Sequence, residues 1–392
     1  MPKHKGKSNG VSRSYEQIET DSKAPLENTQ MKRFGNIYED VCSIENIKEA
    51  HRNARKDKAY YKEVKMVDSN PDYYLGKIRE MLVNKTYKVS EYTVSIINDT
   101  GKERELRKLP YFPDRIIQWA IMLQIEHILL NTMCSHTCAS IPGRGIKRGR
   151  RLMKRYLSDR KETVYALKID IHHFYPSIDH EILKKMLRTK FKDPDLLWLL
   201  DLIIDSIPGG VGIPIGSYLS QYLANFYLSE FDHLMKEKLR VKRVVRYMDD
   251  VTVLAGTKKE LREILKWMQE YLPTIKLQLK DNYQIFPVES RGVDFLGFRF
   301  FHDFVLLRKK TKLKMIARFE HIKYKWDHGL ILNRTEYGSM CSYSGWMRLF
   351  NSHRLRKKYY EPIELAGIVY YTEKILKPKM KRKQLKKEVK AA

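Results

Sequence analysis

One stretch decides the fold of this chain: VVRYMDDVTVL, residues 244–254. β-Branched and apolar residues on both sides predict two strands joined by a tight turn that carries Asp249 and Asp250. Adjacent carboxylates at a hairpin tip repel one another unless a cation compensates them. An isolated Asp-Asp pair is usually a solvated turn, but exposed turns are seldom embedded in strands this apolar. The stretch therefore predicts a cation site at the tip of the hairpin.

A third acid, Asp170, ends another apolar strand, which we predict over residues 164–171. Carboxylates alone form an oxygen ligand set, and Mg²⁺ prefers oxygen. Two such ions held about 3.5–4 Å apart drive in-line phosphoryl transfer. We therefore expect Asp170, Asp249 and Asp250 to be catalytic and to hold two Mg²⁺ ions, for which Mn²⁺ is a possible substitute.

The charge of the chain favours a polyanionic partner. Its 392 residues include 75 Lys and Arg against 47 Asp and Glu, a formal net charge of +28. Nucleic acid fits this excess, because neutralised phosphates release condensed counterions; a merely basic soluble protein is the alternative.

The apolar run at 121–130 is interrupted by Gln124, Glu126 and His127, and the N-terminus lacks a signal-peptide core. We therefore expect a cytoplasmic protein with no membrane partner.

The cysteines and histidines carry less information. Four cysteines are too few for a disulfide framework. Cys134, His136 and Cys138 have a zinc-like spacing, but no second ligand pair follows, and we expect them to be packing residues. His172 and His173 follow the strand-end acid, yet only one of two successive strand residues can face a site. We therefore expect no metal role for either histidine.

The alternation of strands and helices predicts an α+β fold. A turn signal at 98–101 predicts a hairpin within 92–106. Beyond Lys309 the chain is helical and basic, with an expected core stripe of Leu313, Ile316, Phe319 and Ile322. Other expected helices lie at about 114–130, 218–239 and 260–272, and an extended segment lies at 293–300.

Between about residues 102 and 300 the chain resembles the reverse transcriptases. Tyr247-Met248-Asp249-Asp250 matches their YxDD signature, and IDI at 169–171 with FYPSID at 174–179 is similar to their first palm motif. The remaining matches are GIPIG at 212–216 with LSQ at 219–221 and AN at 224–225 (template and nucleotide contacts), Pro110, DRIIQ at 114–118 and GRG at 143–145 (fingers of the bacterial branch), and FLGF at 295–298 (primer-grip hairpin).

The resemblance implies a right-hand polymerase fold with fingers, a palm built on an antiparallel sheet, and a helical thumb. It implies an RNA template, a primer/cDNA duplex and deoxynucleoside triphosphates as partners. The expected regions are a flexible basic arm at 1–30, fingers at 31–163, palm at 164–300, thumb at 301–378 and a basic tail at 379–392.

The resemblance also implies roles for single residues. Asp170 and Asp249 are the expected direct metal ligands, the Ile171 carbonyl is a possible third, and Asp250 is a weaker one. Tyr175 corresponds to an aromatic gate beneath the sugar, which would clash with a 2′-hydroxyl and so select deoxynucleotides. A core aromatic is the alternative for Tyr175.

Further contacts are implied at the fingers and around the hairpin. Lys102 and Arg104 fall where the family clamps the triphosphate, with a solvated basic hairpin as the alternative. Arg144 and Lys147 are expected on template phosphates. The other expected contacts are Ile215, Gly216 and Gln221 with the nucleotide, and Tyr247, Met248 and Gly297 with nucleic acid.

One position departs from the family pattern. The family usually has a Lys after the helix that follows YxDD, proposed as the general acid for pyrophosphate. Counted back from Gly292, that position here is Asn282, and Lys280 lies two residues earlier. Either the register shifts or another group protonates the leaving group.

Ile215 points to a subfamily. An Ile-Gly-x-x-x-Ser-Gln motif is similar to that of diversity-generating retroelement enzymes, where an aliphatic residue at this position is associated with error-prone copying. A small basic accessory protein or a structured non-coding RNA is then a further possible partner. Related motifs occur in phage-defence reverse transcriptases, which would use a dedicated non-coding RNA or protein priming. The remaining alternatives are a non-catalytic basic RNA-binding module, which leaves the three acids unexplained, and an RNA-dependent RNA polymerase, which Tyr175 disfavours.

Overall fold

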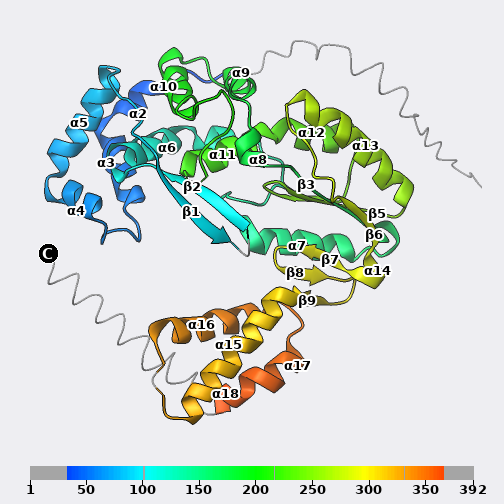
Figure 1. Cartoon of the computed structure of the whole chain (residues 1–392). Coiled ribbons are helices and arrows are strands. Elements are labelled where there is room, and N and C mark those ends of the chain that lie inside the picture. The colour runs from blue at the N-terminus through cyan, green and yellow to red at the C-terminus, as the bar shows by residue number, and fades with distance from the viewer. Residues whose placement is uncertain (1–32, 100–101, 216, 331, 366–392) are drawn as a thin grey trace, which may run out of the picture.

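The computed structural model describes residues 33–365, apart from 100–101, 216 and 331 (Figure 1). The expected arm at 1–30, the basic tail at 379–392 and Gly216 lie outside these residues. The chain begins with a group of helices and continues into a central sheet. It ends with a small sheet next to a C-terminal group of helices. None of the described helices is both long and apolar enough to cross a membrane.

The N-terminal helices pack around α6, which is apolar on nearly all sides. Ile117, Ile121 and Ile125 of this helix are fully buried, and α2, α3 and α11 pack on it. The bounds are α2 Tyr38–Cys42, α3 Ile44–Ala54, α4 Lys62–Ser69, α5 Pro71–Val83, η1 Tyr111–Arg115, α6 Ile116–Asn131, α7 Gly145–Leu157 and η2 Lys161–Thr163.

The predicted finger hairpin is present. Strands β1 (Thr93–Asp99) and β2 (Lys102–Lys108) pair antiparallel, with Asp99 opposite Lys102. Lys102 and Arg104 therefore lie on β2, and their side chains are outside the described part of the chain.

The central sheet is antiparallel and has the strand order β4-β5-β3-β6. Its middle strands are covered on both faces. The cross-strand pair Leu167 and Val253 on one face and the pair Ala166 and Leu254 on the other are almost inaccessible to solvent. The bounds are β3 Tyr165–Asp170, β4 Val244–Tyr247, β5 Asp250–Ala255, β6 Gln284–Pro287, α13 Lys258–Thr274 and α14 Val288–Arg291.

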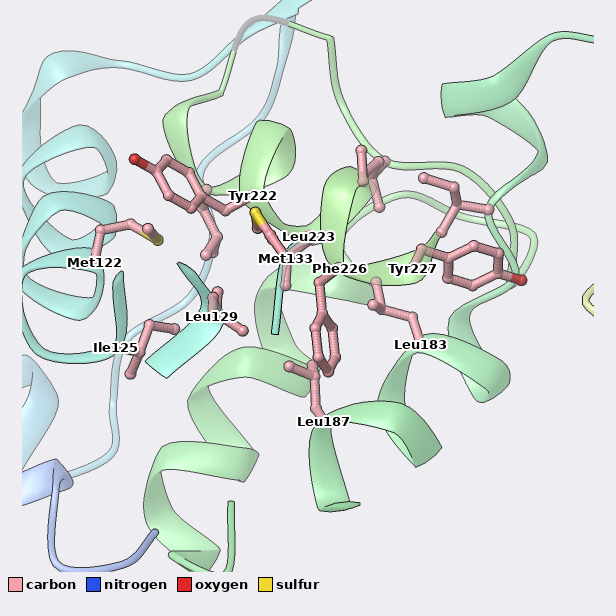
Figure 2. Close-up of a cluster of buried hydrophobic side chains, with 14 of the residues drawn as sticks. Met122, Ile125, Leu129, Met133, Leu183, Leu187, Tyr222, Leu223, Phe226 and Tyr227 are labelled. Carbon is pink, nitrogen blue, oxygen red and sulfur yellow. The ribbon is translucent and has the colours of Figure 1, made fainter. Parts of the chain in front are cut away.

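The helices between β3 and β4 differ from expectation at one point. Residues 218–239 form two helices and not one, because Leu228, with φ −94° and ψ 5°, leaves the helical conformation. The apolar spacing continues across Leu228, so the pattern alone does not show the break. Figure 2 shows Tyr222, Leu223 and Phe226 of α11 packed among side chains of α6 and α9. The bounds are α8 Phe174–Ser177, α9 His180–Lys190, α10 Pro194–Ile204, α11 Tyr218–Tyr227 and α12 Ser229–Glu237.

The C-terminal part combines a three-stranded sheet with helices. The expected stripe on α15 is partly wrong: Leu313 is 52% exposed, while Met315, Phe319 and Ile322 are buried. Two positions along a helix amount to roughly 200° of rotation, so Leu313 points away from the side that Met315 buries. The bounds are β7 Val293–Phe295, β8 Phe298–Phe300, β9 Val305–Leu307, α15 Lys309–Asp327, α16 Arg334–Met347, α17 His353–Leu355, η3 Arg356–Tyr360 and α18 Glu361–Leu365.

Candidate active site

The register of the central sheet brings the predicted acids together. Asp170, the last residue of β3, lies directly opposite Asp250, the first residue of β5. Opposite residues of an antiparallel pair project from the same face, with Cβ atoms about 4.5–5.5 Å apart. Asp249 occupies the preceding turn, and its carbonyl accepts a hydrogen bond from the Ile171 amide at 3.3 Å. Acids from two distant segments thus meet at one tip of the sheet.

The turn is supported from below by a buried arginine. Met248 has a φ of 57°, in the left-handed region that costs an L-residue about 1 kcal/mol or more. Arg246 Nη1 donates a hydrogen bond to the Met248 carbonyl at 3.0 Å. That bond fixes the turn in a conformation that Met248 alone disfavours.

Arg246 belongs to a buried network that the sequence analysis did not identify. Its guanidinium donates to both carboxylate oxygens of Asp232 at 2.6–3.0 Å and to Asn225 Oδ1 at 3.1 Å. Thr137 Oγ1 donates to Asp232 at 2.7 Å, and His136 Nε2 lies 3.2 Å from it. Burial alone would raise the pKa of Asp232, but the charges and hydrogen bonds of Arg246 and His136 together outweigh burial and hold that pKa well below its usual value. The available signal was an arginine inside an apolar strand.

Lys280 reaches the acid cluster. Its Nζ donates to Asp170 Oδ1, and its backbone amide donates to the Asp170 carbonyl at 2.9 Å. Asn282, the position expected from the family spacing, is exposed. The structure thus places Lys280, and not Asn282, beside the strand-end acid.

Lys168 holds the other acid of the cross-strand pair. Its Nζ donates to Asp250 Oδ2 at 2.9 Å and to the Asp294 carbonyl at 2.5 Å. The Asp294 carboxylate in turn accepts from Arg308, which precedes α15, at 2.5–3.0 Å. Sequence reasoning missed this link, although alternation along β3 places Lys168 on the same face as Asp170.

The electrostatics of the tip favour a cation. Burial, and then the neighbouring Asp170 carboxylate, raises the pKa of Asp249. Burial also raises the pKa of Asp250, against the effect of Lys168. Asp250 Oδ1 is buried and has no hydrogen-bond partner among the described residues. Excess negative charge on oxygen donors suits a hard divalent ion.

The acids do not form a ready metal cage. Among the residues that the structure describes, no group of three or more His, Cys, Asp or Glu side chains could hold a metal ion as placed. Lys280 and Lys168 bind Asp170 and Asp250 instead. A metal ion at this tip would therefore either share Asp170 and Asp250 with these lysines or replace them.

Of the predicted nucleotide contacts that the structure describes, Tyr175 lies beside this tip. Tyr175, on α8, stands against the turn with its hydroxyl 3.7 Å from Met248 Sδ. Burial, and then Asp249, raises the pKa of Tyr175. Ile215 lines a cavity of about 280 Å³ together with Arg107 of β2. Gln221 is partly exposed on α11.

The residues predicted to contact nucleic acid differ in their exposure and in the hydrogen bonds that they already make. Arg144 Nη1 donates to the carbonyls of Cys134 and Thr137 at 2.6 and 3.1 Å, so this side chain braces a loop. Lys147 is exposed on α7, and Tyr247 is half-buried at the end of β4. Contact of these residues with nucleic acid stays a prediction.

The primer-grip segment is a tight hairpin, as its resemblance implied. Leu296 and Gly297 form the turn between β7 and β8 with φ angles of 52° and 83°, a pattern that favours glycine at the second position. On Gly149 of α7, a Cβ atom would come within 2.7 Å of Leu296 Cδ1. This glycine, which sequence reasoning did not select, lets the hairpin approach α7.

The remaining histidines and cysteines lie outside the acid cluster. Cys134 and Cys138 are free thiols, and Cys138 is buried. His172 and His173 are exposed and contact each other edge to face, with ring centroids 4.2 Å apart.

An antiparallel sheet that presents acids from a strand end and a hairpin tip defines the palm of a template-directed polymerase. Residues 96–300 match the family model of the reverse transcriptases, or RNA-dependent DNA polymerases, and the chain belongs to this family. The chain is thus an RNA-directed DNA polymerase with the right-hand fold. RNA template, primer and deoxynucleoside triphosphates are the substrates of the family, which generally uses divalent metal ions.

Two curated proteins are similar to this chain. Protein YkfC of Escherichia coli (strain K12) is 26% identical over 262 residues, covering 56% of this chain and 67% of that protein. Nuclear intron maturase 4, mitochondrial, of Arabidopsis thaliana is 28% identical over 185 residues, covering 43% of this chain and 22% of that protein. The chain therefore spans about two thirds of the bacterial relative and less than a quarter of the plant one.

Proposed function

We propose that this chain extends a primer 3′-end on an RNA template with Asp170 and Asp249 as the main ligands of two Mg²⁺ ions. Asp250 is the weaker ligand, and the Ile171 carbonyl is an additional one. The observation that carries the proposal is the direct cross-strand pairing of Asp170 with Asp250 at the tip where Asp249 turns. Mg²⁺, when bound, supplies Lewis-acid activation of the primer hydroxyl and charge neutralisation at pyrophosphate.

The chain's own residues would prepare the remaining steps. Lys280 holds a proton on Nζ beside Asp170, from where it can be given to departing pyrophosphate. Tyr175, fixed against Met248, would exclude a 2′-hydroxyl by contact with the sugar. In the proposal the triphosphate contacts Lys102 and Arg104, and the nucleotide also contacts Ile215, Gly216 and Gln221.

The proposed function also implies contacts of the protein with the primer and the template. Tyr247, Met248 and Gly297 would contact the primer end. Their two hairpins lie next to each other because Lys168 binds Asp250 of the first hairpin and the Asp294 carbonyl of the second. Lys147 and Arg144 would lie along the template. For Arg144 this requires a contact in addition to the two carbonyls that it already binds.

The test is primer extension on an RNA template with purified protein. Asp249→Ala combined with Asp250→Ala should abolish synthesis without unfolding the protein. Asp281→Ala is the matched control, since Asp281 is exposed on the loop that follows Lys280. Retained synthesis by the double variant would remove the proposal. Tight, salt-sensitive RNA binding without incorporation by the wild type would favour the non-catalytic module.

We further propose that the enzyme serves a diversity-generating retroelement and copies with errors. The support is Ile215, an aliphatic side chain at the rim of a cavity where an amide could otherwise check nucleotide geometry. Ile215→Gln should lower misincorporation opposite template adenine, measured by sequencing the cDNA. An unchanged error spectrum contradicts this. The RNA and cDNA that co-purify with the protein can also be sequenced. A dedicated structured RNA among them would instead identify a phage-defence enzyme.

A further inference from the structure

A separate cavity of about 920 Å³ lies in the C-terminal part of the molecule. It is bounded by the outward face of β8 and β9, by the first turns of α15 and by residues 350–359. Arg299 and Leu306 form a cross-strand pair on that face, while Phe298 and Phe300 are buried on the other. The cavity shares no lining residue with the acid cluster or with the predicted nucleotide contacts.

The lining is cationic. Among the described residues that line this cavity there is no acidic side chain, although the chain has 47 Asp and Glu. A concave surface of one sign focuses its potential and attracts an oppositely charged ligand. The cationic lining residues are Arg299, Lys309, Lys312, Arg354 and Lys358, with His353 beside them.

Apolar and aromatic side chains lie among these charges. Phe304 and Leu306 line the cavity although they are 41% and 40% exposed. Tyr359 lines it as well, with the Lys358 ammonium 5.2 Å from its ring. A phosphate group satisfies the cations, and a nucleobase can stack on an exposed ring whatever its sequence. Together the two features fit an unpaired nucleotide better than a simple anion.

The cavity faces a different side from the helix that follows α15. In Figure 1, α16 and α17 lie on opposite sides of α15. Residues of α17 line the cavity, and no described residue of α16 does. A ligand bound there contacts α17 and η3 and none of the residues that hold the acids.

We propose that this cavity binds an unpaired, phosphate-flanked nucleotide of an RNA, as a second RNA site apart from the polymerase centre. The base lies against Phe304 and Tyr359, and the flanking phosphates contact Arg354 and Lys358. An RNA is the favoured ligand because the family works on RNA and the chain carries a net charge of +28. The site would recognise an RNA that holds a single-stranded loop next to paired segments.

The experiment compares two double charge reversals in the full-length protein. Arg354→Glu with Lys358→Glu changes the cavity, whereas Arg348→Glu with Lys357→Glu makes the same charge change at exposed neighbours that do not line it. The probe is a labelled hairpin RNA with an unpaired loop, titrated in the presence of a saturating unlabelled RNA template with its DNA primer. Thermal unfolding checks that all variants fold.

The cavity variant should bind the hairpin RNA at least about tenfold more weakly, while the control variant binds normally. The slope of log affinity against log salt should fall by about 1.4, the value for two lost single-strand phosphate contacts. Phe304→Ala should cost about tenfold with an unchanged salt slope, because it removes stacking and no charge.

Several results overturn the proposal. These are equal losses in both double variants, unchanged binding in the cavity variant, or an equal loss for a duplex DNA of the same length. Displacement of the RNA by a polyglutamate peptide at lower concentration would identify an acidic protein segment as the ligand. Primer extension on a short template should stay normal in the cavity variant. Binding should survive in the variant of Asp249 and Asp250, so failure of this site and failure of the catalytic proposal are distinguishable.

Discussion

Two acid–base clusters meet at the hairpin that carries Asp249 and Asp250, and they differ in access to water. Beneath the turn, the side chains of Arg246 and Asp232 are both 0% exposed, and several hydrogen bonds join them. At the tip, the side chains of Asp170 and Lys280 are 37% and 30% exposed, and Asp250 keeps an oxygen without a partner among the described residues. The cluster beneath the turn is therefore inaccessible to solvent, whereas the cluster at the tip is partly exposed.

The difference separates shape from chemistry. A buried charge that loses its partner is costly, so Arg246 and Asp232 must stay together in the folded protein. A half-exposed ion pair is worth little, because water can replace either partner. The upper carboxylates can therefore exchange a lysine for another cation, while the lower pair holds the turn that presents them.

The sharpest test of the comparison is Asp170→Asn. The primer extension rate should fall by about 10³-fold or more, because a ligand of the catalytic ions is lost. The melting temperature should not fall, because the variant also removes a charge that opposes Asp249. Asp281→Asn is the control in the same assays. An enzyme of near-normal rate would place the chemistry elsewhere.

Arg246→Met should have the opposite profile, with a loss of about 3–5 kcal/mol in the free energy of unfolding. The cause is the uncompensated charge left on buried Asp232. Urea unfolding measures the loss, and adding Asp232→Leu should recover much of it. If the single variant loses less than about 1 kcal/mol, the buried pair does not support the turn as we infer.

Lys168→Met should lower the rate less than Asp170→Asn and the free energy of unfolding less than Arg246→Met. We expect kcat to fall about 10–100-fold, as for groups that orient a metal ligand, with a small change in KM for primer. The free energy of unfolding should change by less than about 1 kcal/mol, because Lys168 and Asp250 are both partly exposed. Lys161→Met is the matched control, because Lys161 is exposed at the start of η2. Lower stability with an unchanged kcat would make Lys168 a structural residue only.

The pH dependence of stability should be the smallest effect. The pKa of Asp232 is lower in the folded chain than its ordinary value of 3.8. The stabilising contribution of ionised Asp232 to the free energy of unfolding is therefore complete above pH 3.8. It is lost as the pH falls through the lower pKa of the folded chain. Acid unfolding followed by circular dichroism should show a smaller drop below this pH for Arg246→Met with Asp232→Leu than for the wild type. An identical acid profile would contradict the role given to Asp232.

Local features were predictable because neighbouring residues decide them. The strands around Asp249 and Asp250 and the finger hairpin formed where the sequence predicted them. The turn at Leu296 and Gly297 was implied by the family resemblance, whereas the residue pattern predicted one extended segment there. Predictions that depended on which way a side chain points were weaker. Leu313, which we expected in the core stripe of α15, is exposed.

The sequence by itself determined the family, the sheet hairpin and the acids at its tip, since alternation of apolar residues and turn chemistry act over a few positions. Only the tertiary structure decided which base stands beside which acid. Lys168 and Asp250 are 82 positions apart, and Lys280 and Asp170 are 110 apart. Such pairs form because strands from distant segments align in one register, and the energy that fixes the register comes from burial across the whole sheet.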